Sequence, residues 1–159
     1  MPVAPHAERL QQALDLAYRF LGRRDRTVAE VRERLEAEGV EAELVGEAIA
    51  ELTRLAYLDD ARYARRFAED RRTLDGWGAE RIGRRLLTVG VDPALINAAV
   101  GERRAAEELE AALTVLRRRL RHGPSNDRER ERALGILARK GYDLELAYDA
   151  VRAYEREAA

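Results

Sequence analysis

The chain has 159 residues, of which 46% are hydrophobic and 37% are charged, and 29 basic against 30 acidic residues leave a formal net charge of −1. This composition suffices for an apolar core and neither supports nor excludes a polyanionic partner. The absence of cysteine excludes a disulfide scaffold and a cysteine-ligated metal site. No apolar run approaches the ~18–20 residues of a membrane span, and the N-terminus is too short and insufficiently apolar for a signal peptide, so we expect a cytoplasmic protein.

The spacing of apolar residues predicts a first group of helices over residues 7–22, 27–38 and 42–56. Thr27 followed by Glu30 fits a capping box, in which each side chain accepts a hydrogen bond from the other residue's backbone N–H. The capping box predicts that the second of these helices begins at Thr27.

A second group of helices is predicted to begin at Asp59, whose carboxylate can cap the first turn. Leu58, immediately before this cap, is expected to pack on Tyr63 as a hydrophobic staple. The segment 75–78, with two glycines, ends this helix.

The next helix is predicted from about residue 79 to residue 89. It stops at Gly90, where glycine can adopt the left-handed conformation that commonly ends a helix. Asp92 and Pro93 then open a third helix, with an acidic cap followed by proline at the first helical position.

The last helices are predicted over residues 103–122, 127–140 and 144–157, and the loop 123–126 separates the first two. No segment shows the alternation of a strand. We therefore expect an all-α protein with about nine helices and no sheet.

The three groups of helices are copies of one unit. Gly39, Gly90 and Gly141 lie 51 residues apart, and many apolar positions keep the same step. The pattern predicts three tandem three-helix repeats, over residues 1–56, 57–101 and 102–159. A unit of this size is marginal alone, so neighbouring units should pack. Further matches are Val31, Ile82 and Ala133; Leu35, Leu86 and Leu137; Leu44, Leu95 and Leu146; and Ile49, Val100 and Val151.

Candidate catalytic groups are few. His6 and His122 are far apart in the sequence, and a cation near a predicted helix C-terminus, such as His122, is an ordinary structural feature. Capping accounts for Asp59, and Asp60 would sit in the favourable first turn, so no metal site is expected. The segment 76–78 follows a helix and is therefore no dinucleotide fingerprint. We expect a non-enzymatic protein with no catalytic residue, metal or cofactor.

Arginines are better functional candidates, because arginine suits bidentate contacts to carboxylate or phosphate. Several of them can be neutralised by an acid four residues away on the same helix, which indicates a solvated surface. These pairs are Arg65 with Glu69, Arg66 with Asp70, Arg71 with Asp75, and Glu80 with Arg84.

A cluster near residue 120 differs, since no acid lies three or four residues from any of its members, Arg117, Arg118, Arg119 and Arg121. Arg117 and Arg121 would also repel each other at a helical spacing of four. We interpret the cluster as an anion-facing patch. The alternative is a solvated helix end that is favoured by the helix macrodipole.

The helix–turn–helix appearance of each unit suggests a DNA reader, but the residues argue against sequence-specific readout. The third helix of the first unit carries Glu43, Glu47 and Glu51, which would repel phosphates. The corresponding helix of the second unit offers Asn97 but few basic groups before Arg103. Base readout needs arginine, asparagine or glutamine at groove-facing positions.

Two segments resemble the RecX family, the regulators of the RecA recombinase. The first, residues 17–39, has an arginine-rich helix end, a threonine cap, a glutamate and a glycine that ends the next helix. The second, residues 55–67, is more specific, because its Leu-Asp-Asp turn with an aromatic-Ala pair is typical of the family. It is followed by Gly78, Ile82, Leu86, Gly90 and Val91. The three-unit arrangement covers nearly the whole chain.

This resemblance implies an elongated, curved array of three three-helix repeats that binds RecA and its filament on single-stranded DNA. It implies inhibition of RecA, with roles in DNA repair, recombination and the SOS response, and direct contact with DNA in some members. We also expect a monomer. Because the chain is not net basic, binding to the filament is better supported than binding to free DNA.

We assign filament or DNA contact first to the cluster of Arg117, Arg118, Arg119 and Arg121. Weaker candidates are Arg62, Arg71, Arg72, Arg81, Arg85, Arg103 and Arg104. Two alternative functions stay open: a helical-repeat scaffold that binds another protein, and a non-specific single-stranded-DNA-binding protein that acts alone.

Overall fold

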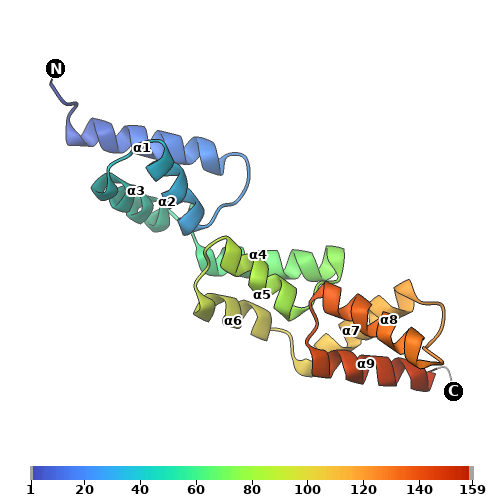
Figure 1. Ribbon diagram of the computed structural model, residues 1–159. Helices are drawn as coiled ribbons and strands as arrows, with labels where there is room; N and C mark the ends of the chain where they lie inside the picture. The colour runs from blue at the N-terminus through green and yellow to red at the C-terminus, as the bar shows by residue number, and fades with distance from the viewer. Residues whose placement is uncertain (1, 158–159) are drawn as a thin grey trace.

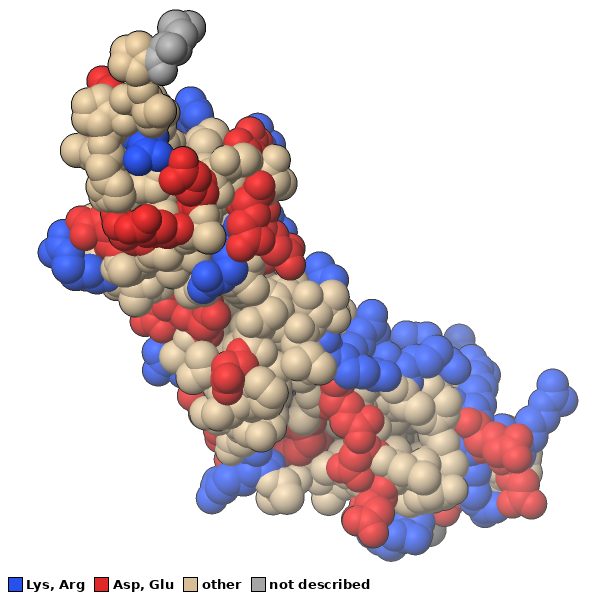
Figure 2. All heavy atoms as spheres, turned by 60° about the vertical axis from the view of Figure 1, so that its left-hand side comes forward, with Lys and Arg blue, Asp and Glu red and all other residues tan. Residues whose placement is uncertain are grey.

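The computed structural model describes residues 2–157, and within this range it contains nine α-helices and no strand, as predicted (Figure 1). The helices form three units in a row, and Figure 2 shows that the row bends. The proposed unit boundaries at residues 56/57 and 101/102 fall in the connections between units. The helices are α1 (His6–Leu21), α2 (Val28–Ala37), α3 (Ala42–Arg54), α4 (Asp60–Asp70), α5 (Ala79–Thr88), α6 (Pro93–Gly101), α7 (Ala105–Arg119), α8 (Asp127–Lys140) and α9 (Leu144–Glu157).

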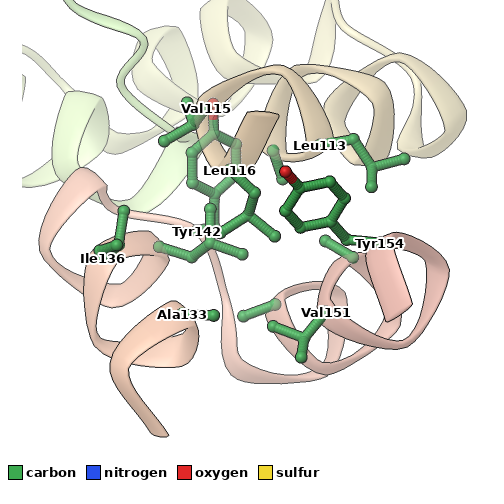
Figure 3. Packing of buried hydrophobic residues seen from close by; sticks show 12 residues of the cluster. Leu113, Val115, Leu116, Ala133, Ile136, Tyr142, Val151 and Tyr154 are labelled. Carbon is green, nitrogen blue, oxygen red and sulfur yellow. The ribbon is translucent and has the colours of Figure 1, made fainter. Parts of the chain in front are cut away.

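Each unit has its own apolar core. Three separate clusters of buried side chains lie among α1–α3, α4–α6 and α7–α9, and every pair of helices in extensive contact belongs to one unit. Figure 3 shows the third core, in which Leu116 of α7, Ile136 of α8 and Val151 of α9 face one another. The units therefore do not share a core.

Predicted helix ends are largely confirmed. Thr27 and Glu30 form the capping box, with both hydrogen bonds at 3.1 Å. Asp59 caps α4 by accepting from the backbone N–H of Arg62 at 3.0 Å. The three repeat glycines have left-handed backbones, with φ of +82°, +85° and +95°.

The predicted staple between Leu58 and Tyr63 is wrong. Leu58 is only 1% exposed and packs in the core of the first unit, whereas Tyr63 packs against the core of the second. The connection after α3 folds back, because the backbone N–H of Leu58 donates to the carbonyl of Leu52 at 3.2 Å. Leu58 thus anchors the connection to the first unit.

The end of α7 also differs from the prediction. The helix stops at Arg119, and Leu120 is extended, with φ −122° and ψ +136°. The Tyr154 hydroxyl donates to the Leu120 carbonyl at 2.8 Å, which holds the chain away from a further helical turn. Arg121 therefore lies outside α7 and does not oppose Arg117 across one helical turn, and His122 is not a helix-terminal cation.

Neighbouring units meet at a narrow polar junction. There the start of the second helix of one unit packs against the end of the second helix of the following unit. At the first junction the Thr27 hydroxyl donates to the Val89 carbonyl at 2.6 Å. The backbone N–H of Val28 donates to the carboxylate of Asp60 at 2.9 Å. The first amides of a helix lack partners within it, and here the following unit supplies one.

The second junction repeats this arrangement 51 residues later. The Gly78 N–H donates to the Lys140 carbonyl at 2.8 Å, and the Ala79 N–H donates to the Glu108 carboxylate at 2.9 Å. A third hydrogen bond, from the Glu80 N–H to the Gly141 carbonyl, measures 2.9 Å. The packing of neighbouring units is therefore mediated by helix ends and glycines.

The glycines at these junctions serve two purposes. Gly90 and Gly141 end their helices in a left-handed conformation, and each also abuts the helix of the preceding unit. A Cβ on Gly90 would overlap the Cβ of Ala29, and a Cβ on Gly141 would overlap that of Arg81. Gly39 has a similar φ but no atom within 4 Å of such a Cβ.

This difference predicts that Gly90→Ala destabilises the protein more than Gly39→Ala. Both substitutions place alanine in a left-handed backbone, at a cost of about 1 kcal/mol each. Only Gly90→Ala also forces the first junction apart. Urea denaturation followed by circular dichroism and by the fluorescence of Trp77 measures both variants. Equal losses of unfolding free energy would contradict the close contact at Gly90.

Candidate functional site

The predicted arginine cluster is partly neutralised. Arg117 pairs with Glu110 at 2.8 Å and with Glu157, so the expectation that Arg117 lacks an acidic partner is wrong. Glu110 lies two turns earlier on α7, and Glu157 is brought in by α9. The hydrogen bonds to Glu157 and Glu110 raise the pKa of Arg117 above its usual range.

The remaining members of the cluster, Arg118, Arg119 and Arg121, are exposed. Within residues 2–157 none of them has a carboxylate oxygen within 4.0 Å. They lie at the far end of the third unit, away from the weaker candidates in the second unit.

Some of the weaker candidates are engaged inside the protein. Arg103 and Glu108 form a 3.0 Å pair with side chains only 14% and 12% exposed, beside the second junction. Arg72 donates to the Val100 carbonyl at 2.8 Å, and burial lowers its pKa. These contacts suit a structural role, because moving a buried pair to a ligand would leave a charge unpaired.

Other candidates make local contacts on the surface. Arg62 donates to the Ala56 carbonyl at 2.8 Å, and Arg104 pairs with Glu107 at 2.8 Å. Arg71 lies in a π-helical turn, Arg71–Asp75, that continues α4.

The predicted pairs at a spacing of four are only partly present. Arg71 pairs with Asp75 at 2.5 Å, whereas Arg66 instead reaches Asp25 of the first unit at 3.6 Å. Arg65 and Arg84 have no carboxylate oxygen within 4.0 Å in the described part of the chain. Their guanidinium groups are thus open to other partners.

The strongest site is a groove that α5 and α8 form across the second junction, here called the α5–α8 groove. Its volume is about 350 Å³. Figure 2 shows basic side chains gathered over the second and third units, on the hollow side of the bend. The lining residues include no acid: Trp77, Arg81, Arg84, Arg85, Thr88 and Arg139.

The geometry of this groove follows from α5 and the junction. Arg81, Arg84 and Arg85 are three and four residues apart and therefore share a helical face. The Arg81 guanidinium lies 4.1 Å from the centre of the Trp77 ring and donates to the Arg139 carbonyl at 3.0 Å. Arg81 is thus held in place, while Arg84 and Arg85 are exposed.

Sequence reasoning found only part of this groove. It named Arg81 and Arg85, but it discounted Arg84 because Glu80 lies four residues earlier, and no ion pair forms between them. It treated Trp77 only as part of a helix end and did not consider Arg139. The 51-residue step relates the two junctions, because Gly78 and Lys140 lie 51 positions after Thr27 and Val89, but only the structure shows that the end of α8 packs against the start of α5.

A smaller cationic site lies on the first unit and was also missed. Phe20 of α1 has the Arg26 guanidinium 4.0 Å from its ring centre and that of Arg34 at 5.6 Å. A pocket of about 170 Å³ beside Phe20 is lined by Leu16, Arg19, Arg23 and Arg34. The arginine-rich end of α1 was its only signal in the sequence.

The lining of the α5–α8 groove suits recognition of anions. Guanidinium groups bind phosphate or carboxylate oxygens in a bidentate manner, and the partly buried Trp77 ring, covered on one face by Arg81, supplies an aromatic edge for a base. Among residues 2–157 no three histidine, aspartate or glutamate side chains gather as metal ligands would. In the same range no helix is both long and apolar enough to span a bilayer.

Comparison with known proteins agrees with this architecture. Family profiles described as the first, second and third three-helix domains of RecX match residues 13–52, 59–100 and 106–151. The chain has TM-score 0.83 to a crystal structure of RecX from Lactobacillus salivarius, with 18% identity, over 94% of this chain and 99% of that one. This structural similarity to the Lactobacillus salivarius protein supports the three-unit helical fold.

Curated relatives are similar over most of their length. The regulatory protein RecX of Amycolatopsis mediterranei is 32% identical over 161 residues, which cover 99% of this chain and 92% of the relative. That of Streptomyces coelicolor is 31% identical, over 93% of this chain and 80% of the relative. With three family profiles matched in order along most of its length, this chain belongs to the RecX family.

Proposed function

We propose that this protein inhibits the RecA recombinase by binding the RecA filament on single-stranded DNA, and so acts in DNA repair and recombination. Family membership supports regulation of RecA. The observation that carries the mode of binding is the α5–α8 groove, where four arginines and an indole ring meet without an acid. Such a groove suits the phosphates and exposed bases of a single strand.

The shape of the molecule supports a filament as the partner. Three separate cores in a row give a long surface, and long repeat arrays use such surfaces to contact extended partners. A group of basic side chains lies on the hollow side of the bend. One molecule could thus contact several protomers at once.

The charge distribution favours the filament over free DNA. Residues 1–56 carry 8 basic and 11 acidic groups, a net of −3, whereas residues 57–101 carry 8 and 7, a net of +1. An acidic first unit weakens long-range attraction to a bare polyanion. In a nucleoprotein filament this unit would face protein, while the α5–α8 groove faces the phosphates.

The proposed function predicts that the protein inhibits the ATPase of RecA from the same organism on single-stranded DNA. Inhibition should appear at amounts below one molecule per RecA protomer, because each molecule spans several protomers. The measurement is steady-state ATP hydrolysis with the protein titrated in. An unchanged rate at equimolar amounts would reject the proposal and would favour the scaffold alternative.

The groove assignment predicts that Arg84→Gln combined with Arg85→Gln weakens inhibition and its dependence on salt. Loss of two phosphate contacts should lower the slope of log affinity against log salt by about 1.4, on the single-strand value of ~0.7 per contact. Fluorescence anisotropy with labelled DNA in the filament gives that slope.

The matched control is Arg65→Gln combined with Arg128→Gln. It removes the same charge from exposed positions that do not line the groove. The control should bind as the unmodified protein does. If both double variants lose affinity equally, net charge and not the groove governs binding. If anisotropy shows equally tight binding to free single strands, the rival of a DNA-binding protein acting alone gains support.

A further inference from the structure

A second pocket, here called the distal pocket, lies at the other end of α8 from the α5–α8 groove. Its volume is about 290 Å³. It is formed by the end of α7, the loop that follows it, and the first turns of α8. The family comparison assigns it no role, and the proposed contact at the α5–α8 groove does not use it.

The distal pocket is strongly cationic. Arg119, Arg121 and Arg132 all line it, and within residues 2–157 none of them has a carboxylate oxygen within 4.0 Å. The one acid in its lining, Glu129, is already satisfied by the backbone N–H and hydroxyl of Ser125, at 2.7 and 2.8 Å. These bonds hold the pKa of Glu129 below its usual range. Three cations thus face one carboxylate.

The wall of the distal pocket is held in place by α9 and by the cap of α8. The Tyr154 hydroxyl donates to the Leu120 carbonyl at 2.8 Å, and Gly123 packs so closely that a Cβ there would lie 2.6 Å from the Tyr154 carbonyl. Asn126 caps α8 through the Glu129 N–H at 2.9 Å. A ligand would therefore find the backbone that carries the arginines already ordered, which lowers the entropic cost of binding.

The lining also limits the kind of ligand. Guanidinium groups match the oxygens of phosphate, while Leu120 and Pro124 supply an apolar wall. The volume is close to the ~300 Å³ at which small-ligand pockets begin, so it exceeds the need of a bare phosphate ion. We propose that the distal pocket binds a phosphate ester with a small carbon body, such as a nucleotide, either free or at the end of a nucleic-acid strand.

This inference concerns the isolated protein and goes beyond filament binding. Its test is calorimetric titration with adenosine 5′-monophosphate, with adenosine as the ligand that lacks the phosphate. The expected result is saturable one-to-one binding of the nucleotide and no binding of adenosine. Absence of binding, or equal binding of the two, would overturn the proposal. RecA is not in the assay, so failure here would leave the proposed function untouched.

Variants locate the site. Arg121→Gln and Arg132→Gln should each weaken nucleotide binding about tenfold, the effect of losing one charge-assisted contact. Arg128→Gln is the control, because Arg128 is exposed in the first turn of α8 but does not line the pocket. An equal loss in the control would show general attraction and reject the pocket. Thermal unfolding should be unchanged in all three, since these arginines have no carboxylate partner.

The same titration identifies the source of the phosphate. Short oligonucleotides with and without a 5′-phosphate are used to displace the bound nucleotide. Displacement only by the phosphorylated strand assigns the pocket to strand ends. Displacement by neither assigns it to free nucleotides. Equal displacement by both strands would contradict recognition of a terminal phosphate ester.

Discussion

The architecture depends on one repeated contact, in which the end of a second helix packs against the start of the preceding unit's second helix. The three cores are separate, so this narrow junction, together with a few side-chain contacts such as that of Arg66 with Asp25, sets how the units lie relative to one another. It works because Gly90 and Gly141 allow both a left-handed helix end and a close approach of backbones. It also gives the first amides of α2 and α5 the partners that a helix cannot supply itself.

The same junction forms the proposed binding surface, but only once. At the second junction Arg81 of α5 lies over Trp77 and beside Arg139 of α8. At the first junction the residue 51 positions before Arg81 is Glu30, which serves the capping box of α2. An acid at this point prevents a cationic groove. The repeated residues therefore form the framework of the three units. The replacement of an acid by arginine at position 81 makes the groove at the second junction cationic.

Local spacing predicted the helices and caps well, because helix periodicity, capping boxes and terminal glycines act over a few residues. It failed where the deciding partner is distant in the sequence. Leu58 joins the core of the first unit, and Arg117 finds Glu157 on another helix, contacts that no local pattern encodes. The candidate site was half predicted: Arg81 was named from its residue type, whereas Arg139 enters through the junction. The role of the α5–α8 groove in binding is a proposal.

The central claim is that the groove across the second junction contacts the nucleoprotein filament. Hydrogen–deuterium exchange of this protein, alone and bound to RecA filaments on single-stranded DNA, tests it most directly. The account predicts added protection in the segments from Trp77 to Thr88 and around Arg139, where backbone amides lie beneath the groove. Added protection confined to the first unit, or absent from these two segments, would contradict it.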